Sequence, residues 1–237
     1  MKFLDTELTN VGLEKVIDIY NRNHLKLTED KKVILKAIIK NNDVAPTLRI
    51  RKSILPKMTF EEYLIKWDLK YNSGFNSRSS IKIAKKSSTY PDSIVKFIFN
   101  ELSFKSATVV DEAEQIHSLF MTIENLVGDL LEEYIYVELK DYGWVWACGE
   151  TLNKIDFCSF NGDFLQIKNS DNSENSASSS VRAGTSIKKW FRRFSTKYNT
   201  YNWSKLRDIT QCNSLSEENF KKFVVDVLKS NSKIINN

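Results

Sequence analysis

The sequence has few of the residues on which several classes of protein depend. Its 237 residues include only 3 cysteines, 7 glycines and 3 prolines. Three cysteines (Cys148, Cys158 and Cys212) cannot all pair within one chain, and none lies in a Cys-x-x-Cys motif, which argues against a disulfide scaffold or a thiolate zinc site. His24 and His117 are the only histidines, which weakens every mechanism that needs several of them. Hydrolytic chemistry in this chain would therefore depend on carboxylates, lysine and a metal ion.

Long apolar runs are also missing. No run approaches the roughly 18 residues that a membrane-spanning helix needs. Asp5 and Glu7 lie where a signal peptide would need an apolar stretch. We therefore expect a cytoplasmic protein with no membrane partner. A hydrophobic fraction of 41% and a charged fraction of 27% are ordinary for a soluble globular chain, and the length suits one sizeable core.

Charge is distributed unevenly along the chain. Residues 111–141 contain nine acidic residues and one lysine, whereas residues 181–207 contain eight basic residues and no acidic one. Residues 47–88 contain ten basic and three acidic residues. The acidic block is either a solvated helix face or part of a cation site. The two basic segments suit a polyanion, because phosphates that they neutralise release counterions.

Apolar residues recur at helical spacing in several segments. Residues 10–40 predict two helices that divide near residues 21–27, with Thr28 as the N-cap of the second. Thr59 and Glu62 form a capping-box pattern that opens a helix to about residue 71. A polar turn from residue 71 is expected to lead into a basic helix. Further helices are expected over 92–102, over 111–139, from Thr185 onward and after Ser216. Residues 42–58 and the segment around Trp203 are expected to be loops.

After Gly143 the spacing of apolar residues changes from helical to that of short strands. Residues 144–148, 152–159 and 163–168 predict short strands, and Asn161-Gly162 between the last two is a strong hairpin signal. This order indicates an α/β fold of α+β character, in which a small mixed central sheet is flanked by helices. We expect a helical N-terminal region over 1–60 and a core over 61–237, joined in one continuous domain.

Four polar residues are expected to converge at the hairpin. Alternate residues of a strand share a face, so Gln166 and Lys168 point together, and Asp156 lies on the partner strand. On the preceding helix, Gly128 would let another element approach closely, so that Glu132 can reach the same place. The Asp156 carboxylate and a second oxygen ligand could hold Mg²⁺, and Lys168 could orient a water or stabilise the transition state. The group suits phosphodiester hydrolysis.

These residues resemble a known nuclease motif. Asp156, Gln166 and Lys168 are similar to the PD-(D/E)xK motif, with Glu132 as the upstream helical acid. Two positions depart from it: Ile155 replaces the proline, and Gln166 replaces the middle acid, as in some restriction enzymes of this superfamily. The segments 123–135, 166–193 and GFNSRSS (74–80) resemble type II restriction endonucleases of the SinI type, and the resemblance covers residues 60–205.

The resemblance implies a restriction-endonuclease-like core and a homodimeric, Mg²⁺-dependent enzyme. Such an enzyme cuts a short palindrome in double-stranded DNA. The SinI type is similar to enzymes that cut GGWCC, which implies a GGWCC-like target here. A DNA methyltransferase would be its genetic partner. The catalytic residues would be Asp156, Gln166, Lys168 and Glu132, and the metal ligands would be Asp156, Glu132, Gln166 and Ile167.

The Ser/Asn-rich tract over 169–180 is typical of a linker by composition alone. Under the resemblance it contacts DNA instead. Arg182 could read a guanine with two hydrogen bonds, and a helix N-terminus near Thr185 could receive a phosphate. The expected DNA-contacting residues are Arg78, Lys82, Asn169, Asn172, Asn175, Ser178, Ser179, Ser180, Arg182, Thr185, Lys188, Lys189, Arg192 and Arg193.

Three other functions are compatible with parts of this pattern. A DNA-binding regulator without catalysis explains the basic segments, and a structure-specific repair or junction-resolving nuclease keeps the four-residue site. An RNA-binding protein would use the aromatic-rich segment 190–203. Single residues also have ordinary structural interpretations: Trp190 and Phe191 would be core residues of a helix, and Glu133 and Glu138 would be solvated.

Overall fold

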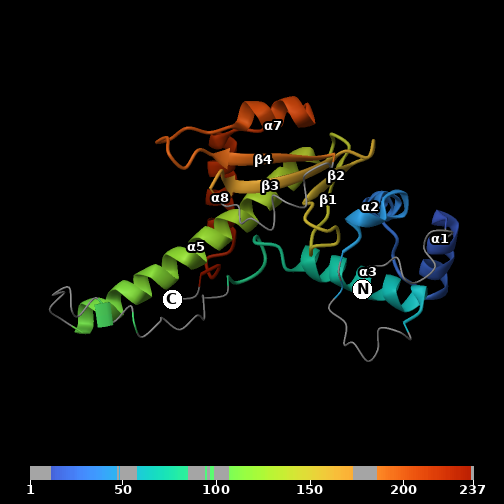
Figure 1. Ribbon diagram of the computed structural model, residues 1–237, viewed down its shortest axis with the longest axis horizontal. Coiled ribbons are helices and arrows are strands. Elements are labelled where there is room, and N and C mark those ends of the chain that lie inside the picture. The colour runs from blue at the N-terminus through green and yellow to red at the C-terminus, as the bar shows by residue number, and fades with distance from the viewer. Residues whose placement is uncertain are drawn as a thin grey trace.

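The structure is a computed structural model that describes residues 12–46, 48, 58–84, 94, 97–98, 107–172 and 186–235, with the backbone alone at 107–111 and 113–114. No helix in these ranges is both long enough and apolar enough to cross a membrane. Figure 1 labels the elements, which in chain order are α1 (Leu13–Arg22), α2 (Glu29–Lys40), the 3₁₀ helix η3 (Asn42–Val44), α3 (Phe60–Asn76), α5 (Ala107–Leu139), β1 (Trp144–Trp146), β2 (Phe157–Ser159), β3 (Phe164–Ser170), β4 (Ile187–Arg193), α7 (Trp203–Thr210) and α8 (Glu217–Ser230).

The first two helices begin and end as the sequence predicts. The Thr28 hydroxyl accepts a hydrogen bond from the backbone N–H of Lys31 and so caps α2. A buried ion pair then joins the N-terminal helices: Lys31 Nζ lies 2.6 Å from Asp68 Oδ1 on α3, and the Tyr20 hydroxyl of α1 donates to the same oxygen. Because both charges are withdrawn from water, removing either partner alone would cost about 3–5 kcal/mol.

Helix α3 opens with the capping box expected at Thr59 and Glu62. It runs to Asn76, however, so the polar turn predicted from residue 71 and the basic helix after it are wrong. The helix continues because Tyr71 is buried and its ring stacks between those of Trp67 and Phe75, which extends the apolar face by another turn. The described residues after it, 77–84, form turns and bends.

The small mixed sheet is confirmed, with strand order β1-β2-β3-β4 in the described part of the chain. β1, β2 and β3 pair antiparallel, and β3 and β4 pair parallel. The Asn161-Gly162 hairpin is confirmed, and Gly162 has a φ of +90°, a conformation that favours glycine. Residues 152–156, expected in a strand, form a turn before β2 instead.

β4 and α7 correct two predictions. The helix expected from Thr185 is wrong, because residues 187–193 form a strand that pairs with β3 from Phe164↔Ile187 to Ser170↔Arg193. Their apolar positions fit either period over so short a span, and the parallel ladder with β3 decides for a strand. The segment around Trp203, expected as a loop, begins α7, which packs beside the edge strand β4 through contact of the Trp203 and Trp190 rings (Figure 1).

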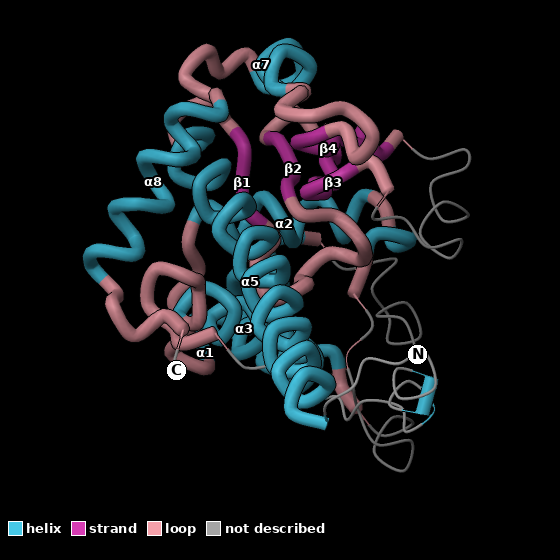
Figure 2. Tube along the Cα trace, turned by 90° about the vertical axis from the view of Figure 1, so that its left-hand side faces the viewer, coloured by secondary structure: helices cyan, strands magenta, loops and turns pink. Residues whose placement is uncertain are grey.

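The long helix α5 is confirmed and crosses the molecule. Its C-terminal half is buried through residues such as Leu130, Leu131 and Ile135, whereas its N-terminal half extends beyond the other described elements (Figures 1 and 2). The Tyr134 ring contacts the Phe220 ring of α8 at a centroid distance of 5.4 Å. The cap predicted at Ser216 opens α8. One hydrophobic cluster contains residues from α1 through to the C-terminal Ile234.

Candidate active site

A pocket of about 800 Å³ lies where the end of α3, the C-terminal half of α5 and the strands meet. The four residues predicted to converge, Glu132, Asp156, Gln166 and Lys168, all line it. They come from three separate elements: the long helix, the turn before β2, and β3. The sequence prediction that these side chains gather in one place therefore agrees with the fold.

Asp156 is fixed from two sides. Its backbone carbonyl accepts a hydrogen bond from the N–H of Ala147 (2.8 Å), and its own N–H donates to the carbonyl of Leu165 (3.0 Å). Its side-chain Oδ2 accepts a further bond from the backbone N–H of Ile167 (2.6 Å). Burial raises the pKa of the Asp156 carboxyl, and the Ile167 N–H and the charge of Lys168 offset part of that rise.

Glu132 reaches the pocket from α5. The indole N–H of Trp146, on β1, donates to Glu132 Oε2 at 3.2 Å and so holds the carboxylate against the sheet. Burial and the negative charge of Asp156 raise the pKa of Glu132, whereas the Trp146 hydrogen bond lowers it. The pocket thus forces two acids together in a place that disfavours their charge. A cation bound between them would remove this penalty.

Gln166 and Lys168 lie two positions apart on β3 and so share one face of the sheet. Gln166 is buried, with 4% of its surface exposed. In the parallel ladder, Gln166 lies beside Lys189 and Lys168 beside Phe191. The predicted hairpin face is therefore continued by β4, which adds a second lysine next to the site.

Gly128 does not have the role predicted for it. A Cβ atom built at Gly128 would meet no atom within 4 Å among the described residues. No described element packs tightly against this point of α5, so a small residue is not needed for Glu132 to reach the pocket. The close approach occurs at Gly74 of α3, where an added Cβ would overlap the backbone of Gly149.

The donors that line the pocket suit a hard cation such as Mg²⁺. Among the described residues, no three His, Cys, Asp or Glu side chains gather closely enough to hold a metal ion by themselves. Mg²⁺ is commonly held by one or two carboxylates together with water and substrate phosphate. Two acids with raised pKa values, next to the amide of Gln166, fit that pattern.

Eleven of the fourteen predicted DNA-contacting residues fall into three groups. Arg78 and Lys82 line the pocket. Lys188, Lys189 and Arg193 lie on β4, where Lys188 forms an ion pair of 3.0 Å with Asp163. Six residues lie outside the described part of the chain: Asn175, Ser178, Ser179, Ser180, Arg182 and Thr185. The helix N-terminus expected near Thr185 is not available for a phosphate, because the strand β4 follows.

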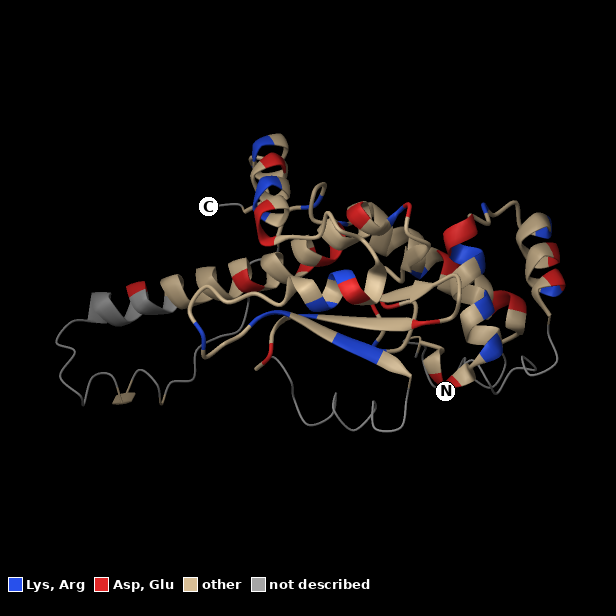
Figure 3. Cartoon of the chain, turned by 90° about the horizontal axis from the view of Figure 1, so that it is seen from above, with Lys and Arg blue, Asp and Glu red and all other residues tan. Residues whose placement is uncertain are grey.

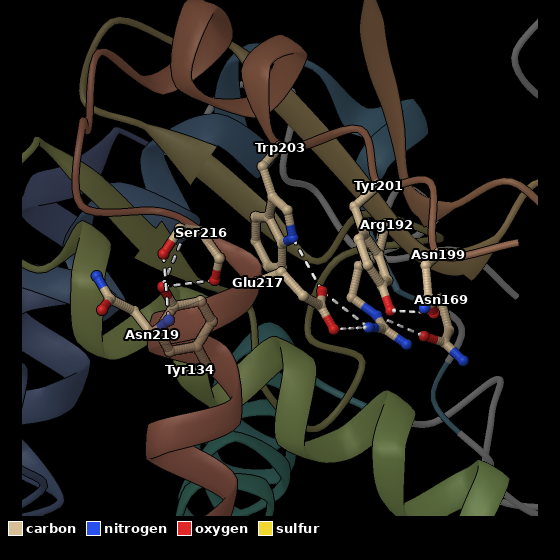
Figure 4. A network of polar contacts seen from close by, with 9 residues as sticks. All are labelled: Tyr134, Asn169, Arg192, Asn199, Tyr201, Trp203, Ser216, Glu217 and Asn219. Atoms are coloured by element: carbon tan, nitrogen blue, oxygen red, sulfur yellow. Dashed lines mark hydrogen bonds and ion pairs between the residues drawn. The ribbon is translucent and has the colours of Figure 1, made fainter.

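Arg192 and Asn169 belong to an internal network (Figure 4). Arg192 Nη1 bonds both carboxylate oxygens of Glu217 on α8, at 2.7 and 2.9 Å, and Nε donates to the Asn169 side chain at 2.9 Å. The same carboxylate accepts the indole N–H of Trp203. Only 11% of the Arg192 side chain is exposed, and it joins the end of β3 to α8. Asn172, in the turn that follows β3, is exposed.

Helix α5 and strand β4 carry charges of opposite sign. Residues 107–139 contain no lysine or arginine, and Figure 3 shows acidic residues along α5 and a run of basic residues on β4. Of the acidic residues on α5, Asp129 and Glu132 line the pocket. The acidic block that the sequence left open between a solvated face and a cation site therefore contributes at least two carboxylates to the pocket.

Three residues in or beside the pocket were given no role in the site from sequence. Trp146 binds Glu132, Asp129 lies one helical turn before it, and Glu133 is 3% exposed rather than solvated as predicted. The sequence could have indicated Asp129, because it lies three positions before Glu132, and positions i and i+3 share a helix face. Nothing in the sequence marks Glu133 as buried, because its partners, Arg78 and Ser80, are more than fifty positions away.

Comparison with known proteins gives a consistent result. A family model described as SinI restriction endonuclease matches residues 18–230. The type II restriction enzyme Eco47I of Escherichia coli is 39% identical over 146 residues, which cover 59% of this chain and 63% of Eco47I, less than two thirds of that protein. The type II restriction enzyme SinI of Salmonella infantis is 36% identical over 160 residues, which cover 65% of this chain and 69% of SinI.

Proposed function

Because this chain belongs to the SinI restriction endonuclease family, we propose that it is a type II restriction endonuclease. It makes Mg²⁺-dependent double-strand cuts in DNA at a short palindromic sequence. The observation that carries the proposal is the pocket in which Glu132, Asp156, Gln166 and Lys168 meet. Two carboxylates and an amide can hold the metal ion, and an ammonium group can stabilise the charge that develops when a phosphodiester is hydrolysed.

Each residue has a role that follows from its chemistry. Asp156 and Glu132, with the Gln166 amide and the carbonyl of Ile167, would hold Mg²⁺. When bound, the ion supplies charge neutralisation at the phosphate and acidifies a water molecule. Lys168 orients the attacking water and stabilises the negative charge that develops on the phosphate oxygens. The N–H of Ile167 holds the Asp156 carboxylate in place as a metal ligand.

The DNA backbone is bound by basic residues around the pocket and on β4. Arg78 and Lys82 are next to the acids, and Lys188, Lys189 and Arg193 follow from β4. Phosphate contacts fix position, whereas base-edge contacts carry sequence information. We assign base contacts to the polar tract after Asn169, including Asn172, Asn175, Ser178, Ser179, Ser180 and Arg182.

A palindromic duplex has two scissile bonds related by a twofold axis. A homodimer places one pocket at each bond, so we propose a symmetric dimer in the cytoplasm. Cutting of this kind would also destroy the DNA of the cell that makes the enzyme. We therefore propose a DNA methyltransferase of matching specificity as its genetic partner. The sequence that both enzymes recognise is proposed to be GGWCC-like.

Digestion of a plasmid of known sequence tests the function. The purified protein should give discrete fragments with Mg²⁺ and none with EDTA, and sequencing of the fragment ends should return one palindrome at every cut. Cutting restricted to branched DNA would identify a structure-specific nuclease. Sequence-specific binding without any cutting in Mg²⁺ or Mn²⁺ would identify a regulator, and either result would contradict the proposal.

A further inference from the structure

The loop that follows α3 brings three polar residues into the pocket. Arg78, Ser79 and Lys82 line it together with the acidic residues. This loop contains the end of the GFNSRSS segment (74–80). Its N-terminal anchor is Gly74, whose Cα hydrogen faces the backbone of Gly149 so closely that a methyl group would not fit. The loop therefore leaves α3 at a fixed distance from the turn that precedes β2.

A buried carboxylate on α5 fixes the other side of the loop. Glu133 accepts hydrogen bonds from the backbone N–H of Ser80 at 2.9 Å and from the Ser80 hydroxyl. Arg78 Nε lies 3.3 Å from Glu133 Oε1, and only 4% of the Glu133 side chain is exposed. Since Glu133 directly follows Glu132, one turn of α5 positions both the loop and an acid of the pocket.

Arg78 is held in one orientation. Its Nη1 donates to the carbonyl of Phe75 at 3.0 Å, and the guanidinium group lies 4.6 Å from the centre of the Phe75 ring. Among the described residues, Nη2 has no hydrogen-bond partner, and 27% of the side chain is exposed. A guanidinium group fixed on three sides loses little entropy when its remaining N–H groups bind a ligand.

Ser79 gives an independent indication of a ligand. The residue is 1% exposed and lines the pocket, yet its hydroxyl has no hydrogen-bond partner in the described part of the chain. A buried hydroxyl without a partner costs stability, so such groups in native proteins call for a specific explanation. A ligand oxygen that accepts the hydroxyl hydrogen would supply it.

Lys82 adds a cation that can change partners. Its Nζ lies 2.6 Å from Asp129 Oδ2, but both side chains are substantially exposed, at 36% and 49%. Exposed ion pairs of this kind contribute at most about 1 kcal/mol. A phosphate oxygen can therefore replace the Asp129 carboxylate at little cost.

We propose that Arg78, Ser79 and Lys82 form a subsite for one DNA backbone phosphate beside the scissile bond, and that Glu133 is the positioning residue that holds this subsite next to Glu132. The inference rests on the proposed nuclease function. It assigns the phosphate contact to a hydroxyl donor and two cations on a loop that belongs to neither the sheet nor the polar tract.

Ser79→Ala is the sharpest test. It removes a buried hydroxyl that has no partner among the residues that the structure describes, so the melting temperature should stay the same or rise. Loss of the phosphate contact should nevertheless lower kcat/KM on a cognate oligonucleotide duplex by about tenfold. The exposed Ser204→Ala, on α7, is the matched control and should cleave like the wild type. Wild-type kcat/KM for Ser79→Ala would overturn the subsite.

Glu133 is tested by a double-mutant cycle with Arg78. Glu133→Gln alone and Arg78→Ala alone should each reduce kcat/KM by about tenfold, and the double variant should lose less than the product of the two, because Glu133 acts in part by holding the arginine. Glu138→Gln is the matched control, since Glu138 lies on the same helix and also accepts a serine hydroxyl. Additive losses would overturn the positioning role. If Glu133→Gln does not fold, Ser80→Ala replaces it in the same cycle.

The salt dependence of binding gives a third readout, measured without Mg²⁺. Lys82→Ala should reduce the slope of log K against log salt by about 1, as expected for one lost phosphate contact. An unchanged slope would remove Lys82 from the subsite. Failure of the wild type to cut any DNA would contradict the nuclease function itself, whereas normal wild-type cutting with normal cutting by Ser79→Ala would contradict the subsite alone.

Discussion

The backbone N–H of Ile167 donates a 2.6 Å hydrogen bond to Oδ2 of Asp156. This bond ties the carboxylate to the centre of β3, between Gln166 and Lys168. The three residues of the motif are therefore held as one unit by a backbone N–H, which every residue except proline supplies at position 167. The remaining acid, Glu132, is held separately by Trp146 of β1.

Lys168→Ala should reduce cleavage of a cognate duplex by about two to four orders of magnitude. Lys168 lies on β3, and its positive charge acts on both Asp156 and Glu132. Alanine cannot orient water or stabilise charge on the phosphate. Specific binding of DNA without metal should remain, because most of the phosphate contacts come from other residues. Gel-shift and single-turnover cleavage measure the two effects, with the exposed Lys221→Ala as control. Cleavage at the wild-type rate would remove Lys168 from the site.

Trp146→Phe should slow cleavage by about tenfold with little change in fold. The substitution keeps the buried ring but removes the N–H that binds Glu132, and a hydrogen bond to a charged group is worth about 1.5–3 kcal/mol. Since that bond lowers the pKa of Glu132, its loss should shift the acidic limb of the pH–rate profile upward. Trp144→Phe is the matched control on the same strand, and an equal effect there would contradict the prediction.

Glu132→Gln should change how stability depends on pH. The raised pKa of Glu132 means that the folded state binds a proton more tightly than the unfolded state. The wild type therefore loses free energy of unfolding as pH rises above the ordinary carboxyl range, about 4, and through the raised pKa. The glutamine variant lacks this loss, so its stability should exceed that of the wild type increasingly toward pH 9. Urea unfolding at several pH values measures it, with Glu124→Gln as the exposed control on α5; parallel curves would contradict the pKa shift.

Two glycines on neighbouring helices should respond in opposite ways to alanine. At Gly74 an added methyl group meets the rigid backbone of Gly149, so Gly74→Ala should lower the free energy of unfolding by about 1–3 kcal/mol. At Gly128 the space is open, and alanine in a helix should raise it by about 0.5–1 kcal/mol. Thermal and chemical unfolding of both variants test this, and destabilisation by Gly128→Ala would show that the helix face there is covered.

Arg192→Ala should weaken the fold more than it weakens DNA binding. The arginine bonds Glu217 and Asn169 and lies over the rings of Tyr201 and Phe220. Its removal leaves the partly buried Glu217 without its cation, which should cost about 3–5 kcal/mol. Unfolding measurements give this value, with Lys188→Ala as the β4 control. A stable variant with uniformly weaker DNA binding would instead make Arg192 a phosphate contact, as the sequence prediction had it.

The family could be predicted because its motifs stand in the sequence. The mixed sheet and most of the helices could be predicted because local sequence signals agree with the tertiary structure. The capping box at Thr59, the cap at Ser216 and the Asn161-Gly162 hairpin act within a few residues. Local signals failed where two periods fit equally well. Residues 187–193 carry an apolar pattern that suits a helix until β3 supplies a parallel partner.

The candidate site was predicted in part for the same reason. Strand alternation placed Gln166 and Lys168 on one face, and the hairpin brought Asp156 beside them. The roles of Gly74, Trp146 and Glu133 could not be predicted, since each depends on a partner far away in the sequence.

The sequence by itself determined the family, the order of helices and strands, and the residue types that can perform phosphodiester hydrolysis. Only the tertiary structure decided which charges serve that chemistry and which are used internally. Glu133 and Arg192 are the clearest cases: both are charged residues expected to face solvent or DNA, and both are held in internal ion pairs. The physical reason is that desolvation and pairing depend on distances between elements, which a linear pattern of charges does not contain.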